Sequence, residues 1–333
     1  MATAVITGAS GLLGGNLAVE LIAQGHEVRA TRRGSTKVAH LESHPIAWVS
    51  AELGDAGSLE AAFRGADVVF HCAAQVSIQR KVTPSLKSAN VDGTRHVLAA
   101  VRAAKVPRLV HCSTVGAVGL SEDGRPCTED ATWNFDAHGM DDGYVTTKHQ
   151  AEELVHEAVH AGLEAVIANP TYMFGPLDSR PSSGAMIVDV ALGKVPGITP
   201  GSNNFVDVRD VARGMILVWE KGRRGERYIL GGENLPYAEI FERIARLAGV
   251  KPPRRNIPRF AANAVGWFGD LSERITGKEP LINSVAVRYG YCKTFMFSSD
   301  KAKSELGYEP HPIDDAIKDA LAWFRAHGML PVA

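Results

Sequence analysis

Short apolar runs alternate with amphipathic stretches along the first half of the chain. The apolar runs are rich in β-branched residues and predict strands, whereas apolar positions three and four residues apart predict helices. The expected strands are residues 4–7, 27–31, 47–51, 68–71, 109–112 and 165–169, and the expected helices are residues 12–24, 58–63, 84–105 (in one or two parts) and 144–160. This alternation is typical of an α/β protein with a Rossmann-type, doubly wound parallel sheet between two layers of helices.

The second half of the chain is less regular, and prolines and glycines are frequent over residues 175–201. We expect residues 1–170 to form the core and residues 171–333 to form mainly a smaller C-terminal lobe. The two parts are expected to interleave, because residues 203–219 and 227–232 again resemble sheet-layer elements that would return to the core.

The composition excludes several classes of protein. With 45% apolar and 22% charged residues over 333 positions and a net charge of -1, the chain resembles a globular protein without a global field that would recruit nucleic acid or an anionic membrane. We expect no signal peptide and no integral membrane segment. Cys72, Cys112, Cys127 and Cys292 lack the spacing of a metal site, so we expect reduced thiols, no metal and a cytoplasmic location.

Three glycines lie between the first expected strand and the first expected helix, in the sequence AVITGASGLLGGNL. Gly8, Gly11 and Gly14 allow a turn with positive φ and let backbone N–H groups approach a phosphate, which the positive end of the helix dipole also attracts. The motif therefore predicts a dinucleotide site. A glycine-rich turn without a ligand is the alternative, since three glycines alone are a weak signal.

Arg32 and Arg33 follow the second expected strand, where a site selective for NAD commonly offers an acidic residue to the adenosine ribose. A guanidinium group binds a phosphate through two parallel hydrogen bonds but gains little from ribose hydroxyl groups. The arginines therefore favour the 2′-phosphate of NADP(H), with NAD(H) as the alternative cofactor. The competing interpretation is that both are solvated surface charges.

Two segments fit the pattern Tyr-x-x-x-Lys, in which a phenol and an ammonium group share one helix face. A nearby ammonium stabilises phenolate, so such a tyrosine can act as an acid and base near neutral pH. Tyr144 and Lys148 open an expected helix and follow the hydroxyl-bearing strand end at Ser113 and Thr114. Tyr289 has only the spacing, so we expect it to be structural.

These motifs occur in the order typical of one superfamily. TGASGLLGG, HCAA, NVDGT, CSTVGAVG and YVTTK are followed by NPTYMFGP, FVDVRDVARG and LGYEPHPIDDAIKDALAWF. The chain thus resembles the extended short-chain dehydrogenase/reductases, the superfamily of NAD-dependent epimerases and dehydratases, over nearly its whole length. VRATRR resembles the dihydroflavonol 4-reductase branch, and GERYILGGENL and RITGKEP resemble bacterial relatives labelled hopanoid-associated sugar epimerases.

The resemblance implies a role for each matching residue. Thr114 would hydrogen-bond the reacting oxygen, with Ser113 in reserve. Tyr144 would be the acid and base, and Lys148 would lower the pKa of the tyrosine and hold the nicotinamide ribose. Glu52 departs by one methylene from the Asp that the family usually places near adenine. The residues implied in cofactor binding are Gly8, Ser10, Gly11, Leu12, Gly14, Arg32, Arg33, Glu52, Leu53, Ala73, Ala74, Tyr144, Lys148 and Pro170.

One departure bears on the substrate of the C-terminal lobe. Nucleotide-sugar epimerases of this kind place an arginine, which holds the substrate diphosphate, where this chain has Asn203. Arg209 or Arg213 is an alternative diphosphate ligand. The preferred function is NADP(H)-dependent reduction of a small-molecule ketone or aldehyde. The alternatives are a redox-neutral, NAD-dependent nucleotide-sugar epimerase or dehydratase and a non-catalytic dinucleotide sensor. The resemblance also implies a homodimer paired through residues 84–105 and 144–160.

Residues 260–275 carry an apolar stripe at helical spacing, formed by Phe260, Ala264, Trp267, Phe268, Leu271 and Ile275. Packing on the core of the lobe is the favoured interpretation. A lid over an apolar substrate is the second. A helix on a membrane surface is the weakest, because Glu273, Arg274 and Lys278 give little basic excess.

Overall fold

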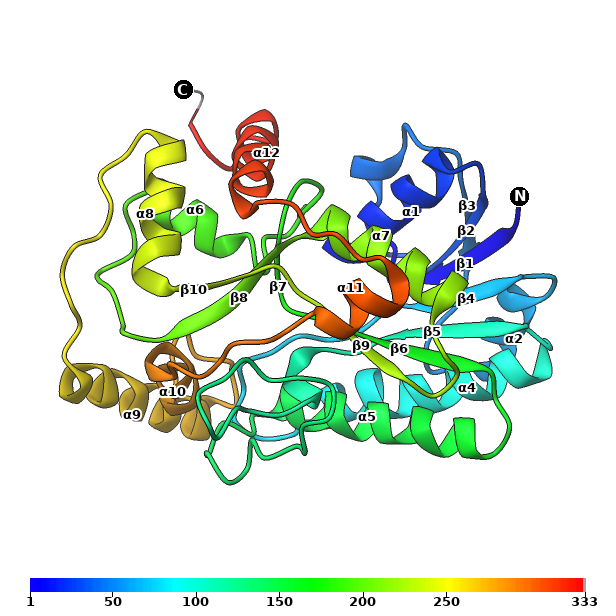
Figure 1. Cartoon of the computed structure of the whole chain (residues 1–333), viewed down its shortest axis with the longest axis horizontal. Coiled ribbons are helices and arrows are strands. Elements are labelled where there is room, and N and C mark those ends of the chain that lie inside the picture. The colour runs from blue at the N-terminus through cyan, green and yellow to red at the C-terminus, as the bar shows by residue number, and fades with distance from the viewer. Residues whose placement is uncertain (332–333) are drawn as a thin grey trace.

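A computed structural model describes residues 1–331, which fold around a seven-stranded sheet (Figure 1). Its strands, in spatial order, are β3 (Ile46–Ser50), β2 (Glu27–Arg32), β1 (Thr3–Thr7), β4 (Val68–His71), β5 (Arg108–Cys112), β6 (Ala165–Pro170) and β9 (Arg227–Leu230). Every neighbouring pair is parallel. The strand order reverses between β1 and β4, which creates the crevice where doubly wound sheets bind ligands at their carboxyl ends. The predicted Rossmann-type α/β fold is confirmed.

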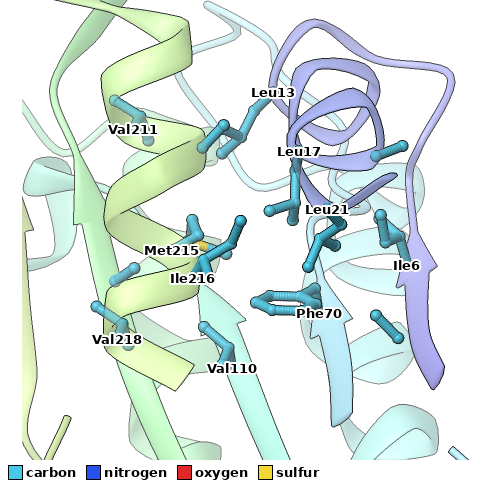
Figure 2. Packing of buried hydrophobic residues seen from close by; sticks show 14 of the residues in the cluster. Ile6, Leu13, Leu17, Leu21, Phe70, Val110, Val211, Met215, Ile216 and Val218 are labelled. Carbon is cyan, nitrogen blue, oxygen red and sulfur yellow. The ribbon is translucent and has the colours of Figure 1, made fainter. Parts of the chain in front are cut away.

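Each face of the large sheet is buried under its own layer of helices. Consecutive strand residues point to opposite faces, so Ile6 and Phe70 join one apolar cluster while Val5 and Val69 join another. The first cluster, shown in Figure 2, lies between the sheet and the helices α1 and α7. The covering helices are α1 (Leu12–Ala23) and α7 (Val208–Lys221) on one face, and α2 (Ala56–Phe63), α4 (Gly93–Ala103) and α5 (Gly143–His160) on the other.

The expected helix over residues 84–105 consists of three pieces. Thr83 caps the short helix α3 (Pro84–Leu86) by accepting a hydrogen bond from the Leu86 N–H, and a π-helical turn (Lys87–Asp92) then leads into α4. The wide turn carries Asn90, whose side-chain amide donates to the Gln75 carbonyl at 3.0 Å and to the Thr147 hydroxyl at 3.0 Å. The π-helical turn therefore connects the loop after β4 to α5.

A second, three-stranded sheet organises the C-terminal lobe. It contains β7 (Tyr172–Phe174), β8 (Ser202–Asp207) and β10 (Glu233–Pro236), with β8 in the middle. The helices α6 (Ala185–Ala191), α8 (Tyr237–Ala248) and α12 (Ile313–Ala326) share an apolar cluster with this sheet. The segment 203–219 therefore contributes to both sheets, whereas we expected the whole segment to return to the core. Its first part lies in the small sheet as β8, whereas α7 covers the large sheet and β9 extends it.

The helices α9 (Arg259–Thr276) and α10 (Ser284–Tyr291) lie together at one end of the lobe, and α11 (Asp300–Leu306) packs on α7 (Figure 1). The prediction that the apolar stripe of α9 packs on the core of the lobe is wrong. Ala262 and Gly266 are buried on the opposite face of the helix, and the stripe itself is exposed. Small residues allow a close approach, since a Cβ on Gly269 would clash with the Ile282 carbonyl.

None of the helices within the described residues combines the length and the apolar character that a membrane crossing requires.

Candidate active site

The turn between β1 and α1 forms a cradle of backbone atoms. Gly8 has φ +78°, and a Cβ there would lie 2.6 Å from the Ala73 nitrogen. A Cβ on Gly14 would lie 2.8 Å from the Ala9 Cα, so both positions require glycine. Gly11 is the N-cap of α1 and supplies no side-chain cap, which leaves the first N–H groups of the helix free for an anion. This geometry fits the pyrophosphate of a dinucleotide.

A cleft of about 540 Å³ opens at this cradle. It brings together nine residues expected to bind the cofactor: Gly8, Ser10, Gly11, Arg32, Arg33, Glu52, Leu53, Ala73 and Ala74. Leu12 and Gly14 are buried beneath the turn, and Pro170 ends β6 farther along the sheet. The cleft is also lined by Thr36, Gln75 and Arg180.

The basic end of the cleft has three arginines. Arg32 extends over the ring of Trp48, with its guanidinium carbon 5.7 Å from the ring centroid, and Arg33 is exposed. Arg180 reaches the same cleft from the loop between β7 and α6. Burial first, and then the charge of Arg180, lower the pKa of His40. Positive charge therefore gathers in this part of the cleft.

Arg180 was missed by the sequence analysis. It lies in a segment rich in prolines and glycines, in which neither spacing nor periodicity marks a binding residue. The loop is nevertheless ordered by the buried Asp178, whose carboxylate accepts hydrogen bonds at 3.1 Å from the N–H groups of Ser182 and Gly184. The contact between this loop and β2 is tertiary, so only the folded chain brings Arg180 to Arg33.

The first turn of α5 fixes Tyr144 and Lys148. Asp142 caps the helix by accepting a hydrogen bond from the Val145 N–H at 2.8 Å. The Gly143 N–H donates to the Gln79 carbonyl at 2.9 Å, so the loop after β4 abuts the start of the helix. Burial raises the pKa of Asp142 to about 6, because a carboxylate is costly away from water.

Lys148 is buried, with 3% of its surface exposed. Its Nζ donates a hydrogen bond to the Cys112 carbonyl oxygen at 2.7 Å, at the end of β5. Burial lowers the pKa of this ammonium, since the charged form loses its hydration. Lys148 therefore lies against the strand end from which the hydroxyl residues Ser113 and Thr114 follow.

Tyr144 and Thr114 meet across this strand end. A hydrogen bond with Thr114 lowers the pKa of the phenol, but burial, the largest cause, and the charges of Cys112 and Asp142 raise it overall. Thr114 is also the N-cap of a 3₁₀ turn (Val115–Ala117). Burial is thus the main cause of the raised pKa of Tyr144, and the expected lowering of this pKa by Lys148 stays a prediction.

A family model described as the NAD dependent epimerase/dehydratase family matches residues 4–231. The chain belongs to this family.

The names of similar proteins include both a reductase and an epimerase. A Synechocystis sp. protein provisionally named dihydroflavonol 4-reductase is 32% identical over 328 residues, which are 97% of this chain and 94% of that protein. Sterol demethylase protein B of Methylococcus capsulatus is 35% identical over 332 residues, which are 98% and 100% of the two chains. A solved structure described as a nucleoside-diphosphate-sugar epimerase from Pseudomonas aeruginosa is 28% identical, with a TM-score of 0.82 and 99% of each chain covered. The predicted superfamily is confirmed.

Two buried histidines lie beneath the site. His71 and His111 are register partners on β4 and β5, with ring centroids 5.4 Å apart. Burial first, and then the charge of Lys148, lower the pKa of His71 to about 3 and lower that of His111 as well. Both imidazoles are therefore neutral near pH 7.

The thiols of Cys72 and Cys112 follow these histidines and interact with each other. Their mutual hydrogen bond raises the pKa of Cys72 and lowers that of Cys112. Cys72 also lines the cofactor cleft. These two thiols thus lie between the cradle and Lys148.

Tyr289 lies outside this arrangement. Its hydroxyl donates to the Met140 carbonyl at 2.9 Å, and its ring packs edge-on against Phe295 at 5.6 Å. Tyr289 therefore braces the loop that precedes α5.

The arginine candidates for a substrate diphosphate are engaged in ion pairs. Arg209 contacts Asp207 and Asp319, each at 2.6 Å. Arg213 pairs with Asp210 and lies 3.7 Å from Glu20. Asn203, at the family's arginine position, is buried, and its Oδ1 accepts a hydrogen bond from the Asn204 N–H.

Proposed function

We propose that the protein is an NADP(H)-dependent reductase of a small, largely apolar ketone or aldehyde. The observation that carries this proposal is that the glycine cradle, the arginines and the tyrosine–lysine pair gather at the carboxyl edge of one sheet. The glycine cradle lies at the carboxyl end of β1, Arg33 and Arg180 line the cleft beside it, and Lys148 lies against the carboxyl end of β5. The residues fit a phosphorylated dinucleotide, because the cradle excludes a Cβ and the cationic groups lie at the β2 side.

The residues of the chain have distinct tasks in this proposal. The cradle binds the pyrophosphate, and Arg33 and Arg180 bind the 2′-phosphate. NADPH, when bound, supplies the hydride. The Tyr144 phenol donates its proton to the carbonyl oxygen of the substrate, and the Thr114 hydroxyl hydrogen-bonds that oxygen. Lys148 holds the nicotinamide ribose and stabilises the phenolate left behind.

An apolar substrate is supported by the lack of a diphosphate site. Asn203 and the paired Arg209 and Arg213 offer no free guanidinium of the kind that a diphosphate requires. The names of two relatives refer to a dihydroflavonol and a sterol, both of which are polycyclic and carry little charge. We propose that residues 171–333 mainly bind this substrate and residues 1–170 the cofactor.

The test is net consumption of NADPH. The purified protein is incubated with NADPH and a panel of flavonoid-like, steroid-like and terpenoid ketones, and absorbance at the wavelength of the reduced nicotinamide is followed. Stoichiometric oxidation with at least one ketone is expected. Tightly bound NAD in the purified protein, with interconversion of sugar nucleotides and no net oxidation, would refute the reductase.

The second candidate is a redox-neutral nucleotide-sugar epimerase or dehydratase. It is favoured by the 28% identical structure from Pseudomonas aeruginosa, which is described as such an epimerase and covers 99% of each chain. In that case Tyr144 would first accept a proton from the substrate and later return it. The nucleotide released on denaturing the purified protein, NAD or NADP(H), distinguishes the two functions.

A further inference from the structure

The helix α9 presents an apolar face to solvent. We define the α9 face as Phe260, Trp267, Phe268, Leu271 and Ile275 together with Leu281 and Ile282 just beyond the helix. Exposed fractions are 78% for Phe260, 64% for Phe268, 74% for Ile275 and 99% for Leu281. An isolated exposed apolar residue is ordinary, but a contiguous set of this kind marks an interaction surface.

The orientation of α9 is fixed by polar contacts on its inner face. Asp270 forms an ion pair with Arg80 at 2.9 Å, and the Glu273 carboxylate accepts a hydrogen bond from the Arg80 N–H at 3.1 Å. After the helix, Glu279 accepts hydrogen bonds from Ser77 and from the Ile78 N–H. The apolar face therefore cannot rotate inward without breaking the contacts of Asp270, Glu273 and Glu279.

Basic side chains lie on α9 and on the segments just before and after it. Arg254, Arg255, Arg259, Arg274 and Lys278 are all exposed, and within residues 1–331 none of them takes part in an ion pair. Arg274 projects from the last turn of α9 itself. The net charge of the whole chain is only -1, so this charge is local. Apolar and aromatic side chains framed by unpaired cations are the combination that anionic lipid surfaces attract.

We propose that α9 docks the protein on the surface of a bilayer that contains anionic lipid. Phe260, Trp267, Phe268, Leu271 and Ile275 enter the boundary between headgroups and acyl chains. The arginines and Lys278 contact the phosphates. The docking is peripheral and reversible, since the helix lies in the plane of the interface rather than across the bilayer.

The same contacts connect the docked helix to the catalytic helix. Loop 77–81 binds Glu273 and Glu279 on one side, and its Gln79 carbonyl accepts the Gly143 N–H at the start of α5 on the other. Docking therefore brings the catalytic end of the lobe to the lipid surface, where apolar substrates partition. This inference does not depend on the proposed reductase activity, because lipid binding is measured without turnover.

The experiment is flotation of the full chain with vesicles. One set is phosphatidylcholine alone, and the other is phosphatidylcholine with an equal part of phosphatidylglycerol. Binding to the second set is expected, with weaker binding to the first and a decrease in high salt. The double variant Trp267→Ser/Phe268→Ser should bind about 10-fold to 100-fold more weakly, from the loss of buried aromatic surface. Arg274→Glu should weaken binding about fivefold or more.

Two variants elsewhere serve as matched controls. Leu192→Ser removes an exposed apolar side chain at the end of α6, and Lys303→Glu reverses an exposed charge on α11. Both should bind like the wild type, and thermal melts check that every variant is folded. Equal binding of the α9 variants and the wild type, or no flotation with either vesicle set, would overturn the proposal. Light scattering that shows self-association abolished by Trp267→Ser/Phe268→Ser, without lipid binding, would assign the α9 face to a second copy instead.

Discussion

The ammonium of Lys148 donates a hydrogen bond to the backbone carbonyl oxygen of Cys112 over 2.7 Å. This contact ties α5 to the carboxyl end of β5, two residues before Thr114. The helix that bears the phenol and the turn that bears the hydroxyl are therefore held as one unit. Lys148→Ala should consequently lower both turnover and cofactor affinity.

Replacing Arg33 with Ala should weaken NADPH binding by about tenfold to a hundredfold, the value of a charge-assisted hydrogen bond to phosphate. NADH binding should change little, because it has no 2′-phosphate. Arg180→Ala should act in the same direction. Titration of each variant with both nucleotides measures the effect, and Arg64→Ala, just beyond the end of α2, is the control. Equal affinity of the wild type for NADH and NADPH would contradict the assignment of these arginines.

Tyr144→Phe should lower turnover by about 10²-fold to 10⁴-fold, because it removes a positioned acid while the ring still packs. Tyr289→Phe should turn over like the wild type. It should lose about 1 kcal/mol of stability with the hydrogen bond to the Met140 carbonyl. Kinetics with any ketone found by screening, together with thermal melts, separate the two. Loss of activity in Tyr289→Phe with retention in Tyr144→Phe would assign the site elsewhere.

Thr114→Val should reduce turnover with little effect on cofactor affinity, since the hydroxyl is assigned to the substrate oxygen. Thr114→Ser keeps the hydroxyl and should be tolerated. The comparison of kcat with the dissociation constant for NADPH in the two variants is the measurement. A large loss of NADPH affinity in Thr114→Val would point to a structural role in the 3₁₀ turn that it caps.

The buried histidines should make the free energy of unfolding decrease at acidic pH. The pKa of His71 is about 3 in the folded protein and about 6.5 in an unfolded chain, so below pH 6.5 only the unfolded chain takes up this proton. Stability should therefore fall as the pH decreases from 6.5 toward 3. Urea unfolding should give a lower free energy of unfolding at pH 5 than at pH 7. This decrease should be about 2 kcal/mol larger for the wild type than for His71→Gln.

The exposed His138 is the control for this titration, and His138→Gln should keep the acid sensitivity of the wild type. Unfolding curves of His71→Gln that shift with pH as much as those of the wild type would show that another group is responsible.

A homodimer through the helices matching residues 84–105 and 144–160 stays a prediction. In one protomer α4 and α5 already lie side by side, and Arg102 donates to the Ala158 carbonyl at 3.0 Å. An isologous contact would complete a four-helix arrangement. Light scattering at micromolar concentration should give twice the mass of the 333-residue chain. A monomer at that concentration would rule the contact out.

Much of the large sheet could be predicted from the chain alone, because buried parallel strands are short apolar runs and amphipathic helices separate them. The expected strand 68–71 coincides with β4, and the expected strand 27–31 falls one residue short of β2. The three strands of the small sheet were harder to predict, since β7 covers only three residues. Its pairing with β8 depends on contacts between segments far apart in the chain.

The stripe on α9 shows a limit of periodicity. Spacing identifies which residues share a helix face, but it does not say whether protein, lipid or water faces them. The buried face of α9 is the one that carries Gly266 and Gly269, because glycine lets the helix approach the backbone of residues 282–284 closely. The position of Arg180 has a similar cause. Arg180 lines the cleft through tertiary contacts that the spacing of residues in the chain does not reveal.

The π-helical turn at Lys87–Asp92 has a consequence for how the length of the chain can change. Such a turn holds one residue more than an α-helix needs to cover the same path. A deletion of one residue within it would let α3 run into α4 as a single α-helix without shifting the buried side of α4. The cost would fall on Asn90, which could no longer reach both Gln75 and Thr147. Loss of a single codon here would thus act on the contact between the loop after β4 and α5 while leaving the core intact.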